Sequence, residues 1–261
     1  MEIAGYIASV LIGISMGLIG GGGSILTIPI LVYLFGISPI LAVSYSLFIV
    51  GSTSIVGAFT NFRRGLVSFR LTLIFGCSST TTVFIIRKFI IPFLPINIFR
   101  IGSVTVTQSL LVMIVFALLM LVAAFSMIRN QHYQLEEKVK PRLFRLMIYG
   151  AIVGLITGFL GAGGGFLLIP ALVILMKVSM KEAIGTSLAI IALNSLIGFV
   201  IDITNVAINW EFLLTVTSIA IGGTFIGIFI NKKINEQKLK RAFGWFVLIM
   251  GIYIIVKEVF F

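Results

Sequence analysis

Two glycine-rich stretches hold the residues of this chain that could bind a small anion. The first reads GLIGGGGSILTIP from Gly17 to Pro29, and the second reads GFLGAGGGFLLIP from Gly158 to Pro170. Glycine destabilises a helix interior by about 1 kcal/mol relative to alanine, so we expect a helix to break within each stretch. Free backbone N–H groups at the start of the half-helix after a break bind anions, and glycines let a ligand approach closely. The expected chemistry is therefore noncovalent binding by backbone amides.

Hydroxyl and amide side chains nearby could complete the coordination of such an anion. Ser46 and Ser187 occupy equivalent positions after the two stretches, which favours a shared role. Two alternatives stay open: the glycines could serve close helix packing, and a hydroxyl can bond a carbonyl of its own helix. The candidate substrate-binding residues are Gly20, Gly21, Gly22, Gly23, Ser24, Ser46, Gly161, Gly163, Gly164, Gly165, Thr186, Ser187 and Asn194.

The two stretches belong to an internal duplication. Residues 13–32 and 154–173 align without a gap, with ten identities in twenty positions and an offset of 141. A broken helix at corresponding points of two halves is a sequence pointer to the binding site of a transporter. We predict two transmembrane repeats, residues 1–128 and 146–261, joined by a hydrophilic linker at 129–145. The paired spacings Gly13/Gly17 and Gly154/Gly158 are typical of close helix packing.

Composition places the chain in a lipid bilayer. Hydrophobic residues make up 59% and charged residues only 10%, against about 45–50% and about 25% in soluble domains. The net charge of +11 comes from loops between apolar runs, so we expect no nucleic-acid partner. The single histidine, His132, lies in the linker, and Cys77 is the only cysteine. We therefore expect no enzyme, no catalytic residues, no cofactor and no metal site, and we expect Cys77 to be a small buried residue. A homo-oligomer is left open.

The predicted elements repeat in each half, giving an all-α polytopic fold. A broken, re-entrant hairpin is expected at 5–35 and again at 146–176. Three spanning helices follow in each half, at 39–62, 71–86 and 109–128, then at 179–201, 212–230 and 242–260. Residues 87–107 are expected to form a loop with an interfacial segment. Ser38 and Ser179 are expected N-caps, the latter within a capping box with Glu182.

Loop charges predict the topology. If each broken unit returns to its own side, 15 of the 19 Lys and Arg residues lie on one side of the membrane. Basic loops stay cytoplasmic, so we expect both termini outside and the two repeats inverted. Two short complete helices per unit would give the same sidedness and remain an alternative. The ionisable residues Arg70, Glu182, Asp202 and Glu211 are expected at helix ends, so no proton relay is predicted and the coupling stays open.

The two glycine stretches ending in Pro29 and Pro170, and the AIGTS segment from Ala183 to Ser187, resemble the TauE/SafE family of membrane transporters, also called the sulfite exporter family. The first copy has Ser44-Tyr45-Ser46 where the second has Gly-Thr-Ser. The resemblance implies a bacterial inner-membrane transporter, an exporter of sulfite or an organosulfonate. Alternatives are a passive anion channel or a transporter of another small organic acid. A transporter of uncharged or cationic solutes and a non-transporting scaffold fit less well.

Overall fold

The computed structural model describes residues 2–93, 97–101, 104–128, 143–161, 165–176, 178–204, 206–231 and 236–260. The described part is helical apart from a small two-stranded hairpin. Among the described residues, six helices are long and apolar enough to cross a membrane. In chain order the elements are α1 Glu2–Ile19, η1 Gly20–Leu26, α2 Thr27–Tyr33, α3 Pro39–Arg63, α4 Phe69–Ile85, η2 Ile86–Ile90, η3 Ile91–Phe93, β1 Asn97–Ile101, β2 Val104–Thr107, α5 Gln108–Ile128, α6 Leu143–Leu160, α7 Gly165–Met176, α8 Met180–Asp202, α9 Trp210–Asn231 and α10 Glu236–Phe260.

Helix starts follow the local signals of the sequence. Ser38 precedes α3 with an extended backbone, and Pro39 occupies the first helical turn, where a missing N–H costs nothing. Ser179 caps α8 as expected, because its Oγ accepts a hydrogen bond of 3.3 Å from the backbone N–H of Glu182. Ser38 makes no side-chain capping hydrogen bond, so of the two expected caps the structure confirms Ser179.

The region after residue 86 differs from its prediction. The helix does not end at Ile86: it continues as the π-helical turn η2 and the 3₁₀ turn η3, so one continuous helical segment runs from Phe69 to Phe93. The expected loop with an interfacial segment is instead this extension followed by an antiparallel hairpin, in which Arg100 pairs with Thr105 and Ile101 with Val104. Pro92 lies in the 3₁₀ turn, where the chain leaves the helix.

Helices from the two halves pack together in pairs. α1 lies along α9, α4 along α6, α3 along α8 and α5 along α10. The offset of 141 relates α1 to α6 and α4 to α9, so the first two pairs are equivalent. Small residues allow both contacts: a Cβ added to Gly13 would overlap the Ala220 carbonyl, and one added to Gly154 would overlap the Ser79 carbonyl. The packing role expected for these glycines is confirmed.

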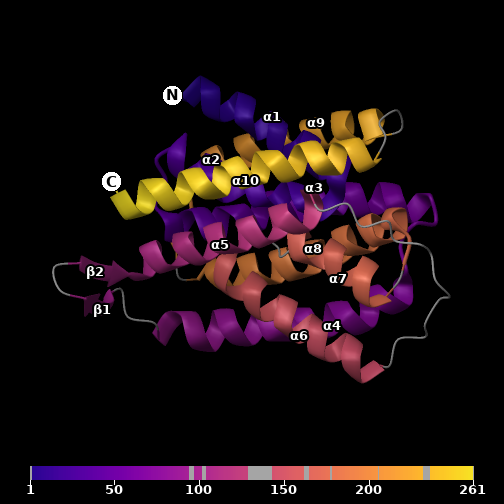
Figure 1. Cartoon of the computed structure of the whole chain (residues 1–261), viewed down its shortest axis with the longest axis horizontal. Coiled ribbons are helices and arrows are strands. Elements are labelled where there is room, and N and C mark those ends of the chain that lie inside the picture. Colours follow the sequence, from indigo (N-terminus) through magenta and orange to yellow (C-terminus); the bar gives the residue numbers. More distant parts are fainter. Residues whose placement is uncertain are drawn as a thin grey trace.

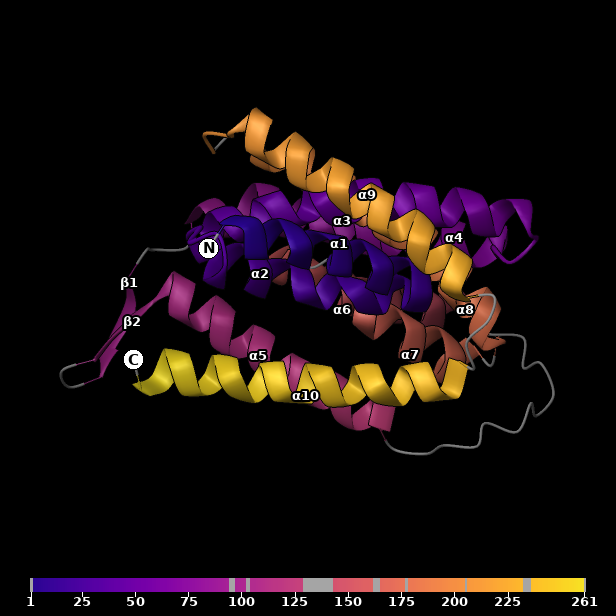
Figure 2. The same ribbon diagram turned by 90° about the horizontal axis from the view of Figure 1, so that it is seen from above.

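The chain returns repeatedly to one end of the molecule. Both termini and the β1–β2 hairpin lie at this end, and α5 runs from it toward the opposite end while α10 runs back (Figures 1 and 2). α2 also leads back to it: the Phe35 ring, just past α2, stacks edge-on against Tyr6 near the start of α1, with centroids 5.4 Å apart. Tyr33 Oη, at the end of α2, donates a hydrogen bond of 3.0 Å to Glu258 near the C-terminus. We call this the terminal end.

Candidate functional site

Both glycine stretches break a helix in the same way. α1 ends at Ile19 and α6 at Leu160, and the next residue in each case, Gly20 and Gly161, has φ of +69°. This left-handed conformation is strained for residues with a side chain and is the usual glycine termination of a helix. After Gly20 the chain continues as the 3₁₀ helix η1, which contains Gly21, Gly22, Gly23 and Ser24. Gly163 and Gly164 lie outside the described residues.

The two breaks contact each other in the interior. A Cβ at Gly21 would lie 2.6 Å from the Gly165 Cα, and one at Gly165 would lie 2.5 Å from the Gly21 Cα. Real Cβ atoms do not approach this closely, so glycine is needed on both sides of the crossing. Each break also packs on the long helix of the other half, because Gly20 faces Ile184 on α8 and Gly161 faces Val43 on α3. The glycines of these breaks are therefore closely packed against protein.

The candidate hydroxyl and amide residues are all buried, and each has a protein partner. Ser24 Oγ donates to the Gly21 carbonyl at 2.8 Å, and Ser187 Oγ to the Ile184 carbonyl at 2.9 Å. Ser46 Oγ lies 2.7 Å from the carbonyls of both Val43 and Gly161, so it reaches the second break directly. Ser24, Ser46 and Ser187 therefore gather at the breaks.

Thr186 and Asn194 make contacts with other elements. Thr186 Oγ1 accepts a hydrogen bond of 3.0 Å from the backbone N–H of Ser68, before α4. Asn194 bonds two hydroxyls of α4: it donates to Ser79 Oγ and accepts from Thr80 Oγ1, both at 2.6 Å. Ser79 and Thr80 of α4 thus pack against α8, and Ser78 donates to the Met147 carbonyl of α6. Cys77 of α4 is exposed, which corrects its expected burial.

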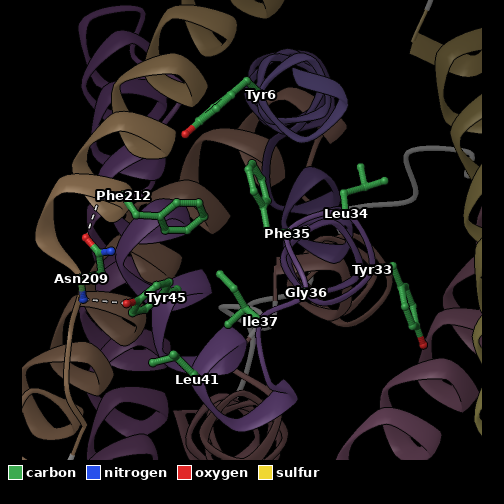
Figure 3. A pocket seen from close by; sticks show the side chains of 10 residues that line it. All are labelled: Tyr6, Tyr33, Leu34, Phe35, Gly36, Ile37, Leu41, Tyr45, Asn209 and Phe212. Atoms are coloured by element: carbon green, nitrogen blue, oxygen red, sulfur yellow. Dashed lines mark hydrogen bonds between the residues drawn. The ribbon is translucent and has the colours of Figure 1, made fainter. Parts of the chain in front are cut away.

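A cavity of about 530 Å³ opens between α1, the α2–α3 connection, α3 and α9 (Figure 3). Aromatic rings dominate it: Phe35 and Phe212 stand edge-on with centroids 4.9 Å apart, and Tyr45 stacks on Phe212 at 5.9 Å. The Tyr45 hydroxyl accepts a hydrogen bond of 2.8 Å from the backbone N–H of Asn209. We call this the aromatic pocket; it lies toward the terminal end, since Tyr6 and Phe35 line it.

A buried ion pair was missed by the sequence reasoning. Arg87, in η2, is 3% exposed and forms an ion pair with the carboxylate of Asp202, the last residue of α8. Asp202 Oδ2 also accepts a hydrogen bond of 2.5 Å from Ser44 Oγ on α3. Asp202 lies at a helix end as expected, but its carboxylate is turned inward onto Arg87 rather than toward the membrane surface.

A signal for this pair was present in the sequence. Arg87 interrupts the apolar run VFIIRKFIIPF at residues 83–93, and Asp202 ends the apolar helix that begins at Met180. Ionisable residues inside membrane segments are rare and usually functional. Because Pro92, Pro95 and Arg100 favour a loop over residues 87–107, the sequence prediction does not place Arg87 and Asp202 at the same depth.

Comparison with known proteins gives consistent matches over the whole chain. Residues 6–254 match the family model described as Sulfite exporter TauE/SafE. A Xylella fastidiosa (strain 9a5c) protein, named a probable membrane transporter protein, is 28% identical over 252 residues, covering 94% of this chain and 91% of the relative. Relatives with the same description from Methanocaldococcus jannaschii and Bacillus subtilis (strain 168) are 25% and 26% identical, covering 95% and 89% of this chain and 93% and 91% of their own lengths. No solved structure matches the chain.

Proposed function

Because the chain belongs to the sulfite exporter TauE/SafE family of membrane transporters, we propose that it carries a small sulfur-containing anion, such as sulfite or an organosulfonate, out of the cell. Transport proceeds by alternating access around the paired glycine breaks. The direct contact between Gly21 and Gly165 carries this proposal, because two helix breaks that meet in the interior place free backbone amides from both halves at one point. The anion would bind there without any enzymatic step.

The proposal includes an inverted arrangement of the two repeats. Applying the offset of 141 to the α1–α9 contact gives the α6–α4 contact, while the α3–α8 contact maps onto itself. α5 and α10, the last helices of the two halves, also pack on each other. This pattern is expected for two halves related by a two-fold axis. α5 and α10 run in opposite directions (Figure 2), which favours an axis in the membrane plane. The apolar helix after the first break runs only from Gly23 to Tyr33, shorter than the roughly 17 residues that a spanning helix needs, which favours a re-entrant hairpin over two complete spans in the first half.

The sidedness of the proposed transporter follows from its loop charges. We place the protein in the bacterial inner membrane with its basic loops in the cytoplasm and both termini outside. Supporting this, α3, whose last residue is Arg63, ends and α6 begins at the end of the molecule opposite the termini (Figure 1). Three crossings separate the N-terminus from the linker in this arrangement, which makes the halves inverted.

The substrate shell would combine backbone amides with nearby polar side chains. The amides of Gly20–Gly23 and Gly161–Gly165 would hold the anion. The hydroxyls of Ser24, Ser46 and Ser187, which donate to backbone carbonyls in the present arrangement, would turn to donate to it. Thr186 and Asn194 would join the shell when the helices move between states. The glycines are packed in the present arrangement, so the breaks must separate for the anion to enter.

Flux into proteoliposomes tests this function. We expect saturable uptake of radiolabelled sulfite with counterflow, and competition by thiosulfate, taurine or a simple sulfonate. Flux that neither saturates nor shows counterflow would identify a passive channel instead. Selective competition by a carboxylate would indicate an organic-acid carrier. The absence of flux with every sulfur anion, from folded protein, would remove the substrate assignment.

A matched pair of glycine variants tests the role of the breaks. Gly22→Val adds a β-branched side chain within η1 and is expected to abolish transport. Gly222→Val makes the same change on α9, where no described atom lies within 4 Å of the new Cβ, and should leave transport unchanged. Size-exclusion profiles of both proteins control for folding. Normal flux in folded Gly22→Val would contradict the proposed role of the first break.

A further inference from the structure

Arg87 occupies a position at which the fold does not require a charge. The offset of 141 places Ile228 at the equivalent position on α9, and Ile228 is buried and apolar. Asp202 and Ser44 correspond to Asn61 and Gly185 in the same way, so the second copy of this arrangement has no ion pair. A buried charge carries a large desolvation cost. Packing therefore does not explain why the terminal end has an Arg–Asp pair and the opposite end does not.

The helix is locally altered where Arg87 lies. Residues Ile86–Ile90 form a π-helical turn, whereas α9 runs as a regular α-helix through the equivalent positions. Such turns are rare and occur frequently at functional sites. Arg87 faces the interior from this turn, while the next residue, Lys88, is exposed beside the rings of Phe84 and Phe89.

Two of the three guanidinium nitrogens of Arg87 have no hydrogen-bond partner among the described residues. Its Nη1 binds Asp202, and the Asp202 carboxylate is itself fixed by Ser44. Its Nε and Nη2 are buried and have no hydrogen-bond partner within the described part of the chain. These two nitrogens form one edge of the planar guanidinium, the edge that binds a carboxylate, sulfonate or phosphate through two parallel hydrogen bonds. Asp202 thus orients the guanidinium and leaves an anion-binding edge unused.

Arg87 lines a cavity of about 200 Å³ between α3, the end of α4, α5 and α8. Ser44, Asp202 and Gln108 are the other polar residues of its lining, and the remainder is apolar. This volume is smaller than the roughly 300–1,000 Å³ of sites for drug-sized ligands, so it suits an anion of few heavy atoms. We call it the Arg87 pocket.

The Arg87 pocket adjoins the second glycine break. Val43 lines the pocket and also contacts Gly161, since a Cβ at Gly161 would overlap the Val43 side chain. Phe159, two residues before Gly161, lines the pocket as well. Ser46, one turn after Val43, contacts the Gly161 carbonyl. An anion in the pocket would therefore be separated from the break by one layer of side chains.

We propose that the Arg87 pocket is an anion-binding site at the terminal end of the transport path, in which the Nε–Nη2 edge of Arg87, covered in the present arrangement, turns toward the cavity and holds a small oxyanion next to the second glycine break. This proposal rests on the proposed function for its place in transport, but binding to the pocket can be measured without transport. The ligand class is a singly charged oxyanion, because Asp202 already offsets part of the guanidinium charge. Anion binding would satisfy the two free nitrogens.

Methanesulfonate binding to the purified protein tests the site, with dimethyl sulfone as the uncharged analogue of similar shape. A ligand that binds only the folded protein raises its thermal midpoint. We expect methanesulfonate to raise the midpoint and dimethyl sulfone to leave it unchanged. Arg87→Lys keeps the charge but removes the two-nitrogen edge, and should weaken binding about 10- to 100-fold. Lys88→Gln removes a neighbouring exposed charge and should bind like the wild type.

Arg87→Gln alone leaves Asp202 buried without its partner and could unfold the protein. The double variant Arg87→Gln/Asp202→Asn removes both charges, and should fold without binding methanesulfonate. Folded double variant with wild-type affinity would overturn the site. An unchanged KM for sulfite transport by this double variant would also overturn the Arg87 site, but it would not contradict the proposed transport function. Arg87-dependent binding without flux of any sulfur anion would instead support the site and remove the transport assignment.

Discussion

Gly154 determines how closely α6 can approach α4. Its Cα lies against the Ser79 backbone, and a Cβ would overlap the Ser79 carbonyl oxygen. Gly13 has the equivalent contact with Ala220 on α9. In a bilayer, helices associate mainly through packing and hydrogen bonds, so small residues at such crossings replace the hydrophobic effect that joins helices in water. The same residue type therefore serves two purposes here, helix packing at Gly13 and Gly154 and helix termination at Gly20 and Gly161.

Gly154→Val is expected to destabilise the protein by about 1–3 kcal/mol, because the added side chain forces the two helices apart. The measurement is the thermal midpoint of the purified protein, followed by size-exclusion chromatography after heating. Gly222→Val is the matched control, since its side chain would enter open space on α9 and should leave the midpoint unchanged. Equal midpoints for the two variants would show that α6 and α4 do not need their close contact.

At the scale of elements, α8 is joined to α4 by a polar contact within an apolar surrounding. Asn194 bonds Ser79 and Thr80, and all three side chains lose partners if the amide is removed. Asn194→Leu keeps the volume and should cost about 1–2 kcal/mol, from two interhelical hydrogen bonds of about 0.6 kcal/mol each and the buried hydroxyls left unpaired. Thermal midpoints measure the loss.

Thr81→Val is the control, because the Thr81 hydroxyl bonds only the Cys77 carbonyl of its own helix. We expect its midpoint to match the wild type. Asn194 is also a proposed substrate residue, and the KM for sulfite separates the two roles. A raised KM for sulfite in Asn194→Leu, with an unchanged thermal midpoint, would show that Asn194 contacts the substrate and does not stabilise the contact between α8 and α4.

The elements differ in how far local sequence determines them. Ser38 and Ser179 marked helix starts correctly, and Gly20 and Gly161 marked helix ends, because caps and breaks act within a few residues. The segment after Ile86 was predicted wrongly, because the chain continues through a π-helical turn to Phe93, and Pro92 lies only in its last turn. Arg87 and Asp202 lie 115 positions apart, and neither residue alone indicates the other. The duplication shows which helices of the two halves are equivalent, but it does not show which of them pack together.

At the scale of the whole molecule, the proposed topology has an odd number of crossings in each half, which would make the two repeats inverted. Three crossings place the α2–α3 connection and the α3–α4 connection on opposite sides of the membrane. Two serines offer matched probes for this, because Ser38 and Ser68 each precede a helix and neither side chain makes a capping hydrogen bond. Replacing either serine by cysteine should therefore change little in the fold.

We expect Ser38→Cys, in a Cys77→Ala background, to react in intact cells with a small membrane-impermeant methanethiosulfonate reagent. Ser68→Cys should react only after the cells are permeabilised, because its turn carries Arg63, Arg64 and Arg70 and basic loops remain cytoplasmic. The Cys77→Ala protein alone controls for background labelling. If both cysteines react in intact cells, Ser38 and Ser68 lie on the same side of the membrane and α3 does not cross it. Labelling of Ser68→Cys alone would reverse the orientation and place the Arg87 pocket at the cytoplasmic face, since the pocket lies at the terminal end together with Ser38.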